Sequence, residues 1–364
     1  MADEHDAWAL GSIARKDGRP TADVLHQALY GLACLAHRSG FVDGEGDGAG
    51  VLTDIPRALW SEVLAEAGHP AALASDPSFA VAHVFVPRED DPAVMERVRA
   101  ILARHGVLVV LERHGGTHGE ALGPRGRTAE PRFWQLAATV PAGARGDRAL
   151  FEAAYAVERE TPATVASLSR TSVVYKLRGN GDQLTRYYVD LVDPRFATSL
   201  AFGHNRYSTN TTTTFERCQP FGVFAHNGEI NTIARLREET AALGLPLSRE
   251  GSDSQDVDAL LRGLVYRLGL HPIEAIELVF PPIMNEIARM PGELQDLYLQ
   301  GRAAIGPVAQ GPAGMLTCFE DVCIFGVDAM GLRPLWHVET AEEHMFSSER
   351  GWVPLARYVA DPQP

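Results

Sequence analysis

Cysteine is scarce in this chain, and the patterns that mark metal or redox proteins are missing. Four cysteines occur in 364 residues, at positions 34, 218, 318 and 323, and they form no C-x-x-C pair. Zinc, iron–sulfur and redox-motif interpretations are therefore weak, and we expect no metal and no cofactor. No apolar run approaches the ~20 residues that a membrane span needs. The few cysteines and the lack of a recognisable signal sequence point to a reducing cytoplasm.

Positive charge is also in short supply. The chain has 33 Lys and Arg against 47 Asp and Glu, which gives a net charge of −14. This balance argues against nucleic acid or an anionic membrane as a partner. An apolar content of 45% suits one large soluble domain. We expect residues 1–7 to be a short solvated leader and residues 8–364 to form a single domain.

Two strand ends carry the clearest chemical signal. Residues 223–225 form an apolar strand-type run that ends in a polar turn, where Asn227 and Gly228 can present N–H donors. Rigid donors of this kind suit a developing oxyanion. A second short strand, residues 199–202, leads to Arg206, whose guanidinium could grip an α-carboxylate with two hydrogen bonds. The alternative is an ordinary hairpin in which Asn-Gly only makes the turn.

A series of further motifs follows in one order along the chain. Together they resemble the class II glutamine amidotransferase domain of glutamate synthase, the N-terminal-nucleophile type. The resemblance implies an α+β fold, a four-layer αββα sandwich of two mainly antiparallel sheets. The segments that carry it are 46–50, 172–176, 188–196, 204–210, 219–221, 226–232, 252–254, 311–313, 331–334 and 348–349.

One position departs from the family pattern. The resemblance implies a catalytic cysteine at the mature N-terminus, and Trp8 stands at that position. The family's chemistry needs a thiolate nucleophile and the free α-amine of the same residue as base. An indole offers no comparable nucleophile, so we interpret Trp8 as an aromatic that packs at the start of the first strand. Cys218 is the only cysteine near the implied pocket that could replace the nucleophile.

The resemblance also implies the roles of the pocket residues. Arg206 would hold the α-carboxylate of an amino acid, and Asp253 would hold its α-ammonium group. The Asn227 side chain and the Gly228 N–H would face the amide oxygen. The alternatives are that Asp253 only caps its helix and that Arg206 only pairs with a nearby carboxylate. Further pocket residues implied in the same way are Tyr207, Ser208, Thr209 and His226.

Two segments near the implied cleft allow structural interpretations. Arg38 would support the nucleophile's surroundings, or else be a cation at a helix C-terminus. The glycine-rich segment 46–50 lacks the preceding strand and following helix of a dinucleotide site. We therefore expect it to be a tight structural loop.

Periodicity predicts the local structure. Thr21 is an expected N-cap for a helix that runs to about residue 38, and Ser252 or Asp253 is expected to cap a later helix. Residues 113–131 are expected to form an exposed loop. Further expected elements are strands at 81–86 and 107–111, a helix over 92–105, and one antiparallel meander made of 315–319, 322–327, 335–338 and 344–346.

Three functional hypotheses remain open. The first is a subunit that keeps the amidotransferase fold and an amino-acid pocket but has lost glutaminase activity. Its expected ligand is glutamine or a glutamate-like amino acid, and its expected partner is a flavin-dependent glutamate-synthase-like subunit. The second is an active glutamine amidotransferase that supplies ammonia to a partner. The third is an enzyme repurposed for another amino-acid derivative.

Overall fold

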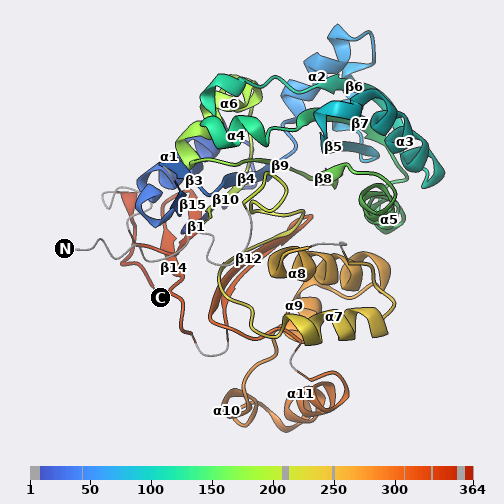
Figure 1. The fold of residues 1–364 in the computed structure, drawn as a ribbon. Coiled ribbons are helices and arrows are strands. Elements are labelled where there is room, and N and C mark those ends of the chain that lie inside the picture. Colours follow the sequence, from blue (N-terminus) through green and yellow to red (C-terminus); the bar gives the residue numbers. More distant parts are fainter. Residues whose placement is uncertain are drawn as a thin grey trace.

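The structure is a computed structural model that describes residues 9–42, 44–206, 213–247, 251–306, 308–328, 331–350 and 357–363. Two antiparallel sheets face each other at its centre (Figure 1). No helix in these ranges is long and apolar enough to cross a membrane.

The larger central sheet has six strands in the order β14-β15-β1-β10-β4-β9. These strands span Trp336–Glu339 (β14), Glu343–Ser347 (β15), Ala9–Arg15 (β1), Leu200–Asn205 (β10), Ala49–Asp54 (β4) and Ser172–Leu177 (β9). The smaller sheet has the order β11-β12-β13, with strands Phe224–Gly228, Ala313–Phe319 and Val322–Val327. Apolar side chains fill the layer between the two sheets, among them Leu10, Leu52, Phe202, Ala225 and Leu316.

Helices cover the two outer faces. Helix α1 (Ala22–Cys34) packs against β1 and β10. On the other side, α8 (Asp253–Arg262) packs against β11, and α7 (Ile233–Ala242) packs against α8. The layers are therefore helix, sheet, sheet and helix, which confirms the fold class expected from the sequence.

A third sheet of four strands extends this sandwich, and it was not expected as a separate unit. Its order is β6-β7-β5-β8, and a two-residue connection leads from β8 to β9 of the larger central sheet. The elements are β5 (Phe79–Val86), β6 (Leu108–His114), β7 (Arg132–Thr139) and β8 (Thr164–Ser169), with helices α3 (Asp91–Arg104) and α5 (Ala144–Glu160). These helices and strands enclose an apolar core of their own. The expected strands at 81–86 and 107–111 and the helix over 92–105 are confirmed here.

Three local expectations need correction. Residues 113–131 are not one exposed loop, because they include the end of β6 and helix α4 (Pro124–Thr128), with Leu122 buried between them in sequence. The expected meander is split, because β12 and β13 belong to the smaller sheet while β14 and β15 join the larger one. Thr21 precedes α1 in extended backbone, but its side chain makes no capping hydrogen bond. Its backbone instead pairs with Thr198.

The remaining elements are short strands and helices that connect these layers. They are β2 (Phe41–Val42), β3 (Glu45–Gly46), α2 (Arg57–Glu66), α6 (Leu184–Tyr187), a π-helical turn (Gly263–Arg267), α9 (Pro272–Val279), α10 (Met284–Ile287) and α11 (Gly292–Ala304), with 3-10 turns at Ala36–Arg38, Ala71–Ser75, Arg88–Asp90, Gly119–Ala121, Gly181–Gln183 and Val189–Val192. In Figure 1, α10 and α11 lie below the layer formed by α7, α8 and α9.

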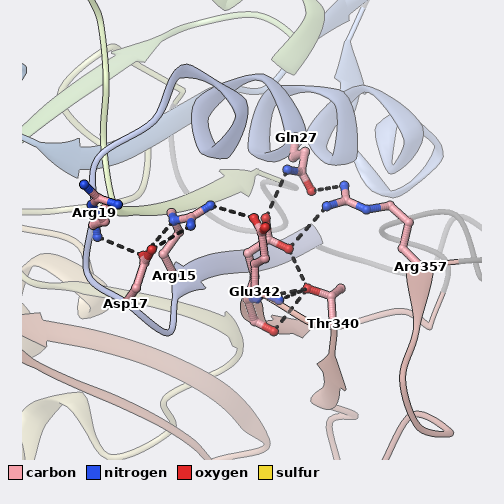
Figure 2. Close-up of polar contacts among 8 residues, drawn as sticks. Arg15, Asp17, Arg19, Gln27, Thr340, Glu342 and Arg357 are labelled. Atoms are coloured by element: carbon pink, nitrogen blue, oxygen red, sulfur yellow. Dashed lines mark hydrogen bonds and ion pairs between the residues drawn. The ribbon is translucent and has the colours of Figure 1, made fainter.

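A polar network holds the C-terminal end of β1 against the hairpin of β14 and β15 (Figure 2). Arg15 forms ion pairs of 2.8 Å with Asp17 and 2.9 Å with Glu342. Next to it, the buried Glu343 carboxylate accepts hydrogen bonds from Thr340 at 2.5 Å and from Arg357 at 3.2 Å. The pair between Arg15 and Glu342 joins the C-terminal end of β1 to the turn between β14 and β15.

Candidate functional site

The ends of β10 and β11 meet across the two sheets. His204, near the end of β10, lies 3.1 Å through Nε2 from the carbonyl oxygen of His226 on β11. Because a carbonyl can only accept, Nε2 carries the proton in this contact. Ala9, the first residue of β1, pairs with Asn205 of β10. The start of β1 and Arg206, the residue that follows β10, therefore lie at the same end of the larger sheet.

Asn227 and Gly228, the two residues expected to donate N–H groups, are the last two residues of β11 and not a turn after it. Gly228 has a φ of 135°, a region that side chains rarely adopt. A Cβ at this position would also collide with the carbonyl oxygen of Pro312. Asn227 is buried beside it. Only glycine fits at position 228, so the sequence Asn-Gly here reflects both the backbone and the close approach of a neighbouring strand.

A buried hydrogen-bond network holds the end of β11 through His226, the residue before Asn227. The His226 N–H donates to Gln219 Oε1 at 2.8 Å, and His226 Nε2 lies 2.7 Å from Ser254 Oγ. Gln219 Nε2 donates to the same hydroxyl at 3.4 Å. The network joins the strand, the segment before it and the first turn of α8.

Asp253 is the first residue of α8, and it is tied to this network. Its Oδ1 accepts hydrogen bonds from the Ser254 N–H at 2.7 Å and from Ser254 Oγ at 3.1 Å. Ser252 is the N-cap, and it forms a capping box with Gln255. Ser252 therefore caps the helix, and the Asp253 carboxylate satisfies a further N–H of its first turn.

Arg206, two residues after His204, is buried, with 5% of its surface exposed. Its N–H donates to the Gly48 carbonyl at 2.8 Å, and its carbonyl accepts from the Gly40 N–H at 3.0 Å. Gly48 lies in the glycine-rich segment, where a Cβ would collide with Cys218 Sγ. The expected loop 46–50 is in fact a two-residue turn, Asp47–Gly48, between β3 and β4, and this turn holds the Arg206 backbone.

Burial keeps the two histidines of the site uncharged. Loss of solvent, and then the neighbouring His226 and Arg206, lower the pKa of His204 to about 3. Burial also lowers the pKa of His226, against the opposing effect of the Asp253 carboxylate. The charges acting on the pair thus come from Arg206 on the β10 side and Asp253 on the α8 side. This distribution is suitable for a zwitterion, which has a carboxylate at one end and an ammonium group at the other.

Arg38 lies near the start of β1 but is engaged by a carboxylate. It forms a close ion pair with Glu349, which His37 Nε2 also contacts at 2.9 Å. The adjacent Ser348 accepts a hydrogen bond from the Leu10 N–H at 3.2 Å through its hydroxyl. Arg38 is therefore placed to support the beginning of β1 through the segment that follows β15.

Cys218 is poorly placed for nucleophilic chemistry. Its side chain is fully buried, and its Sγ lies 3.1 Å from the Thr214 carbonyl and 3.2 Å from the Leu177 carbonyl. Burial raises the pKa of this thiol to about 11. A thiolate, which is the reactive form, is correspondingly disfavoured.

Four of the residues implied by the sequence lie outside the described part of the chain: Trp8, Tyr207, Ser208 and Thr209. Of the others, Arg38 pairs with Glu349, Arg206 directly follows β10, and His226, Asn227 and Gly228 lie on β11. Asp253 begins α8, and Ser254 links it to His226. Sequence reasoning did not find the connecting roles of Gln219, Ser254 and His204. The only signal was that each lies within a motif that supports the resemblance.

Comparison with known proteins identifies the family. The family described as "Glutamine amidotransferases class-II" matches residues 9–359. The chain therefore belongs to the class II glutamine amidotransferases.

Among curated proteins, the chain is 30% identical to "Ferredoxin-dependent glutamate synthase 2" of Synechocystis sp., covering 98% of this chain and 24% of that protein. It is also 30% identical to "Glutamate synthase [NADPH] large chain" of Azospirillum brasilense, covering 97% of this chain and 25% of that protein. It thus spans about a quarter of the length of these relatives. A solved structure of glutamine phosphoribosylpyrophosphate amidotransferase from B. subtilis, complexed with ADP and GMP, covers 94% of this chain and 42% of that one. Its TM-score is 0.40 and its identity is 14%.

Proposed function

We propose that this chain is a glutamate-synthase-like amidotransferase domain that binds an amino acid but does not hydrolyse glutamine. One observation carries the binding half of the proposal. A buried cation, Arg206, follows β10, and a carboxylate, Asp253, begins α8. Hydrogen bonds through His204, His226 and Ser254 link both elements to β11, which ends in Asn227 and Gly228. An amino acid with a side-chain amide has three groups for these three positions: α-carboxylate, α-ammonium and amide oxygen.

The loss of hydrolysis rests on Trp8. β1 begins at Ala9, and the family match also begins there, directly after the tryptophan. An indole at this position supplies neither thiolate nor the reactive N-terminal group of the family's chemistry. The burial and the raised pKa of Cys218 argue against that thiol as a substitute. Glutamine or glutamate is the ligand we propose, and a glutamate-synthase-like protein is the partner we propose, because the curated relatives carry this domain within a much longer chain.

Ligand-induced stabilisation tests the binding site. Glutamine or glutamate should raise the melting temperature, because a ligand that binds only the folded state stabilises it by about 2.7 kcal/mol at a hundred times its Kd. Arg206→Ala should abolish the shift. Arg186→Ala is the matched control, since the Arg186 side chain is 59% exposed and forms its ion pair with the exposed Asp182. A shift that survives Arg206→Ala, or no shift with either amino acid, would contradict the proposed pocket.

A further inference from the structure

Two of the four cysteines, Cys318 and Cys323, face each other across the hairpin of β12 and β13. The register of the two strands pairs Cys318 directly with Cys323 and Phe319 with Val322. The turn between them consists of Glu320 and Asp321, and Glu320 has the positive φ of 51° that is typical of tight hairpin turns. Both thiols are free in this structure.

The hydrogen bonds show which kind of cross-strand pair this is. The Cys318 N–H donates to the Val223 carbonyl at 2.9 Å, towards β11 and away from β13. Cys318 and Cys323 therefore form a non-hydrogen-bonded pair, in which the Cα atoms of facing residues lie about 4.5 Å apart and the side chains approach most closely. This separation falls within the range of ~4.4–6.8 Å that disulfides span.

The surroundings of the two thiols differ. Cys318 is buried in the apolar layer between the sheets, next to residues such as Leu316 and Ala225, whereas Cys323 is partly exposed. A hydrogen bond with the Cys323 thiol, and then burial, raise the pKa of Cys318 well above its ordinary value. The register places the two side chains next to each other on one face of the hairpin, and Cys323 is the one that a small molecule can reach.

We propose that Cys318 and Cys323 form a dithiol modification site, which a low-molecular-weight disulfide converts to a cross-strand disulfide. In the first step the Cys323 thiolate attacks one sulfur of glutathione disulfide. The oxidant's S–S bond breaks, and one glutathione leaves as thiol after taking up a proton. In the second step Cys318, losing its proton, attacks the Cys323 sulfur, and the second glutathione leaves. Two thiols are oxidised, and one disulfide is reduced to two glutathione molecules.

The link would join β13, the edge strand of the smaller sheet, to β12. Strand β12 also carries Ala313, which pairs with Gly228 at the end of β11. One strand therefore connects the dithiol to the candidate amino-acid site. The proposal itself depends only on the hairpin and holds whether or not that site binds an amino acid.

Intact-mass measurement of the full-length chain after incubation with glutathione disulfide tests the proposal. The Cys34→Ser variant is used as the parent, because Cys34 is exposed and would react independently. The parent should lose two hydrogen atoms and carry no glutathione, and peptide mapping should place the link between Cys318 and Cys323. Phenylarsine oxide, which bridges neighbouring thiols, should bind the reduced parent once per chain.

Single replacements separate the two steps. Adding Cys318→Ser should stop the reaction at a glutathione adduct on Cys323, and adding Cys323→Ser should leave Cys318 unmodified. The parent keeps both thiols, so its result does not depend on whether a replacement disturbs the core. A parent that accumulates the adduct on Cys323 without closing, or that does not react at this pair at all, would overturn the proposal.

Discussion

Removal of the Ser254 hydroxyl should show how strongly the buried hydrogen-bond network around His226 stabilises the end of β11. Ser254 Oγ lies 2.7 Å from His226 Nε2, receives Gln219 Nε2 at 3.4 Å and donates to Asp253 at 3.1 Å. Ser254→Ala removes this shared partner at a position that is 3% exposed, where water does not readily replace it. A buried polar group without its partner costs about 1–3 kcal/mol. We therefore expect the free energy of unfolding to fall by about 2 kcal/mol.

Equilibrium urea unfolding at neutral pH measures this loss. Ser61→Ala is the matched control, because Ser61 makes one hydrogen bond, of 3.0 Å to the Ala71 carbonyl, at the surface. That replacement should change the free energy of unfolding by no more than about 0.5 kcal/mol. The reasoning fails if Ser254→Ala is as stable as the control. Any stabilisation by glutamine should also weaken in Ser254→Ala, since Asp253 would lose a hydrogen bond that orients it.

Three further expectations follow from the site. Gly228→Ala should destabilise the fold by more than Gly68→Ala in urea unfolding. Both glycines have positive φ, 135° at Gly228 and 82° at Gly68, but only Gly228 has no room for a Cβ. Backbone strain of this kind alone costs about 1–3 kcal/mol. Equal losses of stability in the two variants would contradict the collision at Gly228. As the pH is lowered below about 6.5, the free energy of unfolding should decrease, by up to about 1.4 kcal/mol per pH unit for each buried histidine. His204 stays neutral in the folded chain down to a pKa of about 3 while the unfolded chain takes up the proton, so His204→Gln should reduce this slope between these pH values; an unchanged slope would exclude His204 as its source. Deletion of residues 1–7 with Trp8→Cys should restore weak glutaminase activity, because losing a single oxyanion donor typically costs ~10²–10³ in rate and those donors are kept. A repaired chain that folds, binds glutamine and releases no ammonia would show that the cleft has diverged beyond its nucleophile.

The sequence was sufficient to predict the two strands that lead to the candidate site. The apolar runs before Asn227 and Arg206 marked two strands that end in polar residues, and the structure confirms both as β11 and β10. Strand alternation and turn chemistry are local properties, so they can be read from neighbouring residues. The layer order came from the family resemblance rather than from any local pattern.

The connections within the site could not be predicted in this way. Ser254 and His226 are 28 positions apart, and their hydrogen bond depends on how α8 packs on β11. The split of the expected meander has a similar cause. β13 and β14 follow each other in the chain, yet β14 finds its partner in β15 of the other sheet. Periodicity assigns a strand, but tertiary packing assigns its sheet.

The four-stranded sheet shows the same limit. Its strands β5 and β7 are separated by α3 and β6, and they pair over eight residues from Phe79 to Val86. Only β5 and β6 were expected from the sequence, and β7 and β8 were not. A separate sheet with its own core is a property of long-range pairing. Gly48 is an opposite case, since its glycine-rich surroundings indicated a tight loop before its contact with Cys218 was known.

Ammonia release from glutamine by the purified full-length chain tests the central claim most directly. With Trp8 at the nucleophile position and the Cys218 thiol buried, release should not exceed that of buffer, and 6-diazo-5-oxonorleucine should label no residue. Ammonia release that Arg206→Ala abolishes would contradict the account, because it would require a working nucleophile in the same pocket. A labelled peptide that contains Cys218 would identify that nucleophile.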